Sequence, residues 1–131
     1  MSQPPVDPEE LLSRFLTQPK NHFVPTTGRV RYASFLPNKA LQTSVYRTEG
    51  LSSAEVWKIA DDLVGAPLGR PIPARADLGA KIVYHQGLAI DPDGVPHPRH
   101  ANIIGWPGSR SAQKLLAIKL AEAAVCVLRP I

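Results

Sequence analysis

Two proline-rich stretches limit where helices and strands can form in this chain. Residues 66–75 contain three prolines and residues 92–107 contain four. Proline fixes its own backbone angle φ and has no amide donor, so it is rarely found inside a helix or a central strand. We therefore expect irregular backbone within these stretches and regular elements before, between and after them.

The first patterned segment, residues 7–16, predicts a short helix. Asp7 is suited to the N-cap and Pro8 to the first helical position. Four apolar residues follow at helical spacing, namely Leu11, Leu12, Phe15 and Leu16. Pro19 ends the segment because a helix does not continue through it.

The next segment, residues 29–47, predicts an antiparallel β-hairpin. Residues 29–36 and 41–47 are rich in strand-forming residues and flank a turn at residues 37–39. If Leu36 pairs with Leu41, one face of the hairpin is apolar and packs on the core. Arg29 and Arg31 then lie on the other face, which is exposed to solvent.

Residues 52–65 carry the clearest helix start, because Ser52 and Glu55 have the spacing of a capping box. Gly65 is suited to the end of this helix. Residues 81–84, 88–90 and 101–104 predict short strands. A final helix is expected to begin at Ser109 or Ser111 and to extend to about residue 128.

These segments together predict an α+β fold, with a small mostly antiparallel sheet that includes the hairpin and is packed by about three helices. A length of 131 residues fits one domain over residues 1–131. Residues 1–6 are polar and proline-rich, and we expect them to form a flexible N-terminal tail.

Composition excludes several classes of protein. Apolar residues make up 44% of the chain, too many for a disordered protein, and charges interrupt every long apolar run. The beginning of the chain lacks a basic segment followed by an apolar one, so we expect no signal peptide and a cytoplasmic location. A single cysteine, Cys126, excludes an internal disulfide and a thiolate metal cluster.

Residues 85–106 hold the densest group of chemically active side chains, including three of the four histidines. Prolines reduce the entropy cost of holding such a loop in one shape. One hypothesis is a hydrolytic enzyme with His97, His100 and Asn102 as catalytic residues. A second is a divalent metal cofactor such as zinc, iron or nickel, with ligands drawn from His85, Asp91, His97 and His100. Histidines exposed on an ordinary turn are the alternative.

A net charge of +4 permits binding to nucleic acid without requiring it, because the basic residues are scattered. The candidate contacts are Arg29, Arg31 and Arg47 around the hairpin. The alternative is that these charges belong to an ordinary solvated strand face.

The leading functional prediction is a small binding or accessory protein that acts through a protein–protein surface. Trp106, between two turn glycines, is a candidate anchor for a partner. The final helix is apolar on most of its circumference, which fits either the core or self-association. We expect no contact with a membrane.

Overall fold

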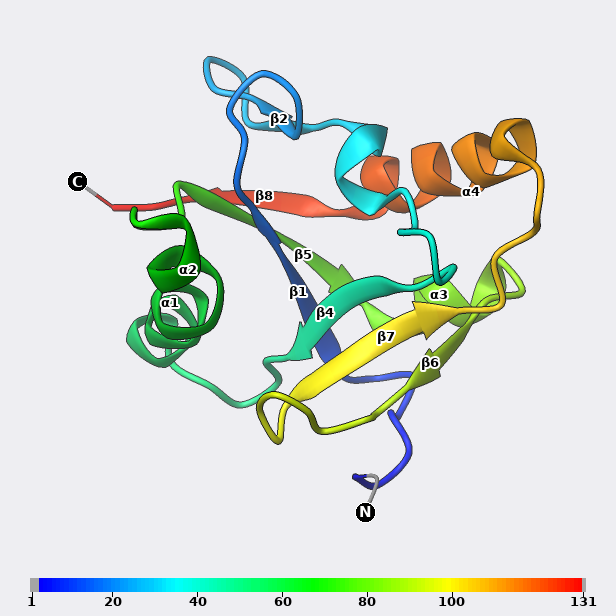
Figure 1. Cartoon of the computed structure of the whole chain (residues 1–131), viewed down its shortest axis with the longest axis horizontal. Coiled ribbons are helices and arrows are strands. Elements are labelled where there is room, and N and C mark those ends of the chain that lie inside the picture. Colours follow the sequence, from blue (N-terminus) through cyan, green and yellow to red (C-terminus); the bar gives the residue numbers. More distant parts are fainter. Residues whose placement is uncertain (1–2, 131) are drawn as a thin grey trace.

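Six strands form one antiparallel sheet in the computed structural model, which describes residues 3–130 (Figure 1). They are β1 (Leu11–Leu16), β4 (Thr43–Arg47), β5 (Ala74–Gly79), β6 (Ala89–Asp91), β7 (His100–Ile104) and β8 (Val125–Leu128). Their order across the sheet is β6–β7–β4–β1–β5–β8, and every pair is antiparallel. Two short strands, β2 (Phe23–Val24) and β3 (Arg29–Val30), form a separate hairpin.

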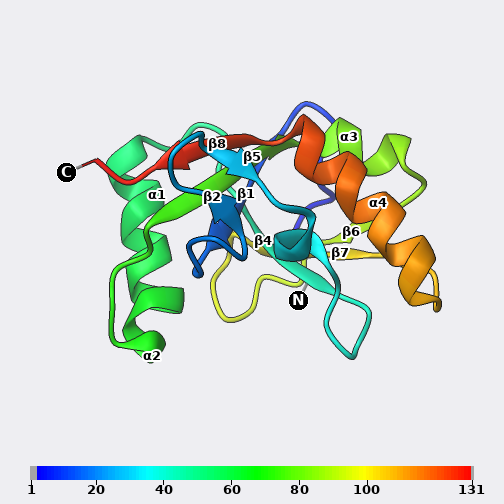
Figure 2. The same ribbon diagram turned by 90° about the horizontal axis from the view of Figure 1, so that it is seen from above.

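Helical segments cover the two sides of the sheet (Figure 2). On one side, α1 (Ser53–Ala60), the π-helical turn η2 (Asp61–Gly65) and α2 (Ala66–Leu68) follow one another without a break. On the other side lie the 3-10 helix η1 (Tyr32–Phe35), α3 (Ala80–His85) and α4 (Arg110–Ala123). The predicted α+β class with a mostly antiparallel sheet is confirmed.

The strand register gives the sheet two unlike faces. We call one the polar face because Ser13 and His100 lie on it, although Phe15 and Tyr46 on the same face pack on α1. Directly paired residues point to the same side of a sheet, and neighbours along a strand point to opposite sides. Ser13 pairs with Tyr46, and Tyr46 pairs with His100, so these three share a face. The opposite face carries buried apolar side chains, among them Leu12, Val45, Ala101 and Ile103, and packs on α3 and α4.

The capping box predicted at the start of α1 is present. The Ser52 hydroxyl accepts from the amide of Glu55 at 3.2 Å, and the Glu55 carboxylate accepts from the amide of Ser52 at 3.1 Å. The helical path does not end at Gly65 but continues to Gly69, whose φ of +72° is the left-handed conformation that glycine favours. Irregular backbone therefore begins after α2, and β5 already begins at Ala74.

The helix predicted over residues 7–16 is wrong, because residues 11–16 form β1. This strand lies inside the sheet and is covered on both sides, so four of its six residues are buried and its sequence does not alternate. A continuous apolar run of that length fits a buried strand as well as a helix. Asp7 caps only a turn, in which the amide of Glu10 donates to the Asp7 carbonyl oxygen at 2.9 Å.

The strand pairing predicted within residues 29–47 does not form. Residues 29–30 pair with β2 instead, and residues 32–35 are the helix η1. β4 pairs with β1 on one side and with β7 on the other. The strand-forming residues of β4 were recognised correctly. Its partners β1 and β7 are distant in the sequence, and local turn signals do not indicate them.

Predictions for the second half of the chain are confirmed in part. β6 and β7 occupy the expected strands near residues 88–90 and 101–104, and Ser109 caps α4. Residues 81–84 are helical, within α3, rather than a strand. The last helix ends at Ala123, and β8 adds an edge strand to the sheet where helix was predicted.

The segment predicted as a flexible tail makes specific contacts where it is described. Val6 is buried, and its carbonyl oxygen accepts from the Tyr84 hydroxyl at 2.7 Å. The Arg47 guanidinium donates to the Pro4 carbonyl oxygen at 2.7 Å. Within residues 3–130, no helix has the length and hydropathy needed to cross a membrane.

Candidate functional site

A serine, a histidine and an aspartate form a continuous hydrogen-bonded chain on the polar face of the sheet. The Oγ atom of Ser44 lies 2.7 Å from Nε2 of His100. The Nδ1 atom of His100 lies 2.7 Å from Oδ1 of Asp93. Ser44 is in the middle of β4, His100 begins β7, and Asp93 is in the loop between β6 and β7.

The donors and acceptors of this chain follow from its chemistry. An ionised carboxylate can only accept, so the His100 proton belongs on Nδ1, toward Asp93. Nε2 of the neutral ring is then an acceptor, and the Ser44 hydroxyl donates to it. A hydroxyl bonded to an imidazole that is oriented by a carboxylate is the arrangement of an activated serine nucleophile.

Asp93 is held by a second hydrogen bond and by the path of its loop. Its Oδ2 atom accepts from Nδ2 of Asn102 at 3.0 Å. The amide of Gly94 donates to the His100 carbonyl oxygen at 3.1 Å, which fixes the loop against the start of β7. Gly94 has φ of +68°, so the turn uses a conformation that glycine adopts without strain.

The His100 ring is buried and packs against Tyr46. The two rings meet edge to face with centroids 5.1 Å apart, and His100 is only 7% exposed. Burial raises the pKa of the Tyr46 phenol, and the Asp93 charge raises it further, so Tyr46 is a neutral neighbour at physiological pH. The hydrogen bonds to Asp93 and Ser44 orient the imidazole with Nε2 facing Ser44, and Tyr46 packs against the ring.

Ser44 opens into a cavity of about 390 Å³ between the sheet and the η2–α2 segment. Its walls include Phe15 and Tyr46 from the sheet, together with Leu63 and Leu68 from the helical side. We call this space the Ser44 cavity. A largely apolar pocket with a few polar groups at one point is the usual form of a small-molecule site.

Arg14 contributes the charged part of the cavity wall. The β1–β4 pairing contains only two pairs and ends at Ser13, after which the two strands diverge (Figure 1). Arg14 fills the gap, and its guanidinium donates to the Ser44 carbonyl oxygen at 2.9 Å and to the Ser34 carbonyl oxygen at 2.8 Å. Burial lowers the pKa of Arg14, although arginine remains charged at any physiological pH.

The structure brings together two of the predicted catalytic residues, His100 and Asn102, and leaves His97 outside the chain of hydrogen bonds. His97 Nδ1 accepts from the amide of Arg99 at 3.1 Å, and its ring lines a different pocket, beside Arg99. Ser44, Asp93 and Arg14 were not among the predicted site residues, and the acid predicted in this loop was Asp91. No local signal was available for Ser44, because it is 56 residues from His100.

The predicted metal ligands are not gathered in one place. His85 ends α3, and Asp91 ends β6. In the part of the chain that the structure describes, no group of three or more His, Cys, Asp or Glu side chains could hold a metal ion. His100 already uses both of its ring nitrogens, for Asp93 and Ser44.

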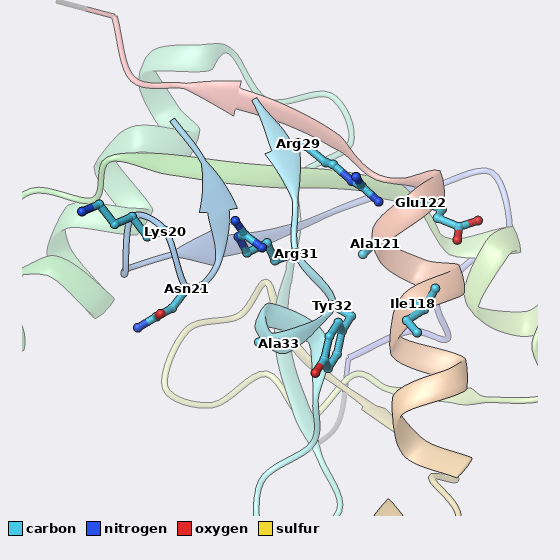
Figure 3. A pocket seen from close by; sticks show the side chains of 9 residues that line it. All are labelled: Lys20, Asn21, Arg29, Arg31, Tyr32, Ala33, Ile118, Ala121 and Glu122. Carbon is cyan, nitrogen blue, oxygen red and sulfur yellow. The ribbon is translucent and has the colours of Figure 1, made fainter. Parts of the chain in front are cut away.

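The predicted nucleic-acid contacts are divided between two places. Arg29 and Arg31 line a second pocket of about 320 Å³, together with Lys20. Figure 3 shows the Tyr32 ring beside Ile118 of α4 in this pocket, with Arg29 extending toward α4. Arg47 lies elsewhere, where it forms an ion pair with Glu10 at 2.7 Å.

Trp106, the predicted partner anchor, is only 5% exposed. Its Nε1–H donates to the Ile103 carbonyl oxygen at 3.1 Å, within the larger apolar cluster. The indole is therefore part of the core of this structure and is not on its surface. The helix predicted for self-association, α4, buries one face through residues such as Ala117 and Leu120.

Comparison of the chain with protein-family models, with curated protein sequences and with solved structures finds no match. The function is therefore inferred from the geometry of the site alone.

Proposed function

We propose that this protein is a hydrolase that cleaves esters with Ser44 as nucleophile, His100 as general base and acid, and Asp93 as the group that orients the imidazole. The supporting observation is the hydrogen-bonded chain of three side chains that ends, at Ser44, in a cavity of ligand size. Serine nucleophiles with this constellation occur on unrelated folds, so geometry is the proper criterion.

The reaction divides into two steps. Ser44 Oγ attacks the ester carbonyl carbon while its proton passes to His100 Nε2, and the C–O bond then breaks as Nε2 returns the proton to the leaving alcohol. Water next attacks the acyl–serine ester and gives a proton to Nε2. Collapse of this second intermediate releases the carboxylic acid and returns the proton to Ser44.

The test is covalent labelling with an alkyl fluorophosphonate, followed by mass spectrometry. We expect one adduct, on Ser44, which forms as fluoride leaves. Ser44→Ala should remove the adduct, and His100→Ala should slow labelling at least about 100-fold because the base is lost. Ser111→Ala is the matched control, since Ser111 is exposed but has no histidine partner among its hydrogen bonds in residues 3–130.

Labelling of Ser111 or of another serine at the same rate as Ser44 would contradict the proposal. So would a Ser44 adduct that forms equally fast in the His100→Ala protein. Circular dichroism melting curves should show that both variants remain folded, so that a lost adduct reports chemistry.

Nucleic-acid binding is the second candidate, and the observation that favours it is the shared pocket of Lys20, Arg29 and Arg31. Salt-dependent retention on heparin should weaken in Arg29→Ala/Arg31→Ala. It should change less in Lys39→Ala/Lys81→Ala, which removes two exposed charges elsewhere. Arg47→Ala should also have little effect, because Glu10 already balances that charge. Equal losses of retention in the two double variants would show that binding depends on net charge and not on this pocket.

An accessory role through a protein–protein surface remains a prediction, and so does the cytoplasmic location. The exposed apolar side chains of edge strand β8, Val125 and Leu128, support self-association at the C-terminal end of the chain. A concentration series by analytical ultracentrifugation tests it. A monomer at all concentrations would argue against this surface.

A further inference from the structure

Arg14 is a partly buried positive charge whose hydrogen bonds within residues 3–130 go to two carbonyl oxygens. None of the ion pairs in the described residues includes it, whereas three other arginines, Arg47, Arg75 and Arg129, are each paired with a carboxylate. A guanidinium has five N–H donors, and these two contacts leave several of them available.

Arg14 differs from these three arginines, because its hydrogen-bond partners are the backbone carbonyls of Ser34 and Ser44. Carbonyl dipoles orient a guanidinium but do not neutralise it. A positive charge that is partly removed from water and has no counter-ion attracts an anion, so the site favours an anion that can complete the pair.

The position of Arg14 indicates where that anion would lie. Arg14 lines the Ser44 cavity, and it is the one charged residue among those that line it in the described chain. Asp93 does not serve as the counter-ion, because no ion pair within residues 3–130 joins it to Arg14 and its carboxylate is directed at His100 and Asn102. Tyr46 cannot serve either, because burial raises the pKa of its phenol and keeps it neutral.

We infer that the Ser44 cavity takes esters that carry an oxyanion group, a carboxylate or a phosphate, and that Arg14 binds this group beside the nucleophile. The inference rests on the proposed function of Ser44, and it adds the substrate class. A planar guanidinium matches both anions through paired N–H donors. The apolar walls at Leu63 and Leu68 suit the hydrocarbon part of such a substrate.

The test compares two esters of equal chain length, mono-4-nitrophenyl adipate and 4-nitrophenyl hexanoate, which differ only in the terminal carboxylate. The wild-type protein should prefer the adipate at least about 10-fold in kcat/KM. Arg14→Gln should remove this preference through a higher KM for the adipate, with little change for the hexanoate. Arg14→Lys should keep part of it, and Arg110→Gln, which removes an exposed charge elsewhere, should keep all of it.

Three results would overturn the inference. One is equal turnover of both esters by the wild-type protein. Another is an equal loss of kcat for both esters in Arg14→Gln, which would place Arg14 at the reacting oxygen. The third is measured on the wild-type protein and therefore does not depend on folded variants. Inorganic phosphate would fail to slow the fluorophosphonate labelling of Ser44. These results can be distinguished from failure of the proposed esterase function. In that case Ser44→Ala would leave the turnover of both esters unchanged.

Discussion

Two hydroxyl–carboxylate clusters lie on the same face of the sheet, and they differ in what separates hydroxyl from acid. In one, His100 stands between Ser44 and Asp93. In the other, the Ser13 hydroxyl donates directly to Asp77 at 2.7 Å and also contacts the Thr48 hydroxyl at 2.8 Å. Ser13 is fully buried, whereas Ser44 faces a cavity.

The comparison shows that residue types alone do not make a reactive site. The Asp77 carboxylate accepts directly from Ser13 and also from Arg75, so no imidazole takes part in this contact. An imidazole, in contrast, can take a proton near neutral pH and return it. The Ser13 cluster is therefore structural, and the Ser44 cluster has both a base and access to substrate.

The largest expected difference between the clusters is in activity. Ser44→Ala should reduce ester hydrolysis by about 10³-fold or more, because the nucleophile is lost. Ser13→Ala should leave the rate within about 2-fold of wild type, since Ser13 touches neither the cavity nor His100. Steady-state kinetics with 4-nitrophenyl hexanoate compares the two, and similar losses in both variants would remove the distinction.

The two aspartates should also differ in their effect on activity, although by less than the two serines. Asp93→Asn should lower kcat by about 10²-fold, because an amide no longer favours the productive tautomer of His100. Asp77→Asn should affect kcat little. The readout is kcat for each variant together with fluorophosphonate labelling of Ser44. An Asp93→Asn protein with wild-type kcat would show that Asp93 has only a structural part.

The effect on stability should be larger for Ser13→Ala than for Ser44→Ala, which is the reverse of the order for activity. Ser13→Ala leaves buried polar groups on Asp77 and Thr48 short of a partner, so it should reduce the free energy of unfolding by about 2 kcal/mol. Ser44→Ala should cost less than about 1 kcal/mol, because its side chain is only partly buried and faces the cavity. Urea unfolding followed by tryptophan fluorescence measures both, and an equal cost would contradict the assignment of Ser13 as structural.

The smallest effect concerns an ion pair with no reactive neighbour, Glu10 with Arg47. The hydrogen bond from Arg47 holds the pKa of Glu10 below its ordinary 4.5, although burial acts in the opposite direction. A depressed carboxyl pKa contributes stability above the ordinary value, and this contribution is lost as the pH falls through the lower folded value. Glu10→Gln should therefore cost about 1 kcal/mol at pH 7 and almost nothing near about pH 2. A cost independent of pH would contradict the ion-pair explanation.

Part of the fold and part of the site could be predicted from local patterns. The capping box of Ser52 and Glu55 fixes a helix start through contacts three residues apart, and it is present as predicted. The polar, proline-rich loop after β6 was predicted to carry site residues, and it brings Asp93 to His100, seven residues away, although the acid predicted there was Asp91. Such short-range contacts can be recognised because their partners lie within one turn or one loop.

Other features could not be predicted because they depend on burial and on distant partners. Residues 11–16 have an apolar spacing that suits a helix, and only their place inside the sheet makes them a strand. Cys126 lies in β8, at the edge of the sheet, beyond the helix that was predicted to include it. Local spacing cannot distinguish these outcomes, since each depends on which neighbours cover the segment.

The sequence by itself determined the α+β class, the start of α1, and the proline-rich loop that leads into β7. Only the tertiary structure brought Ser44 to His100 and Arg14 to the cavity wall, because β4 pairs with strands that are remote in the chain. Hydrogen bonds between side chains require atoms within about 3 Å, and strand pairing is what supplies that proximity here.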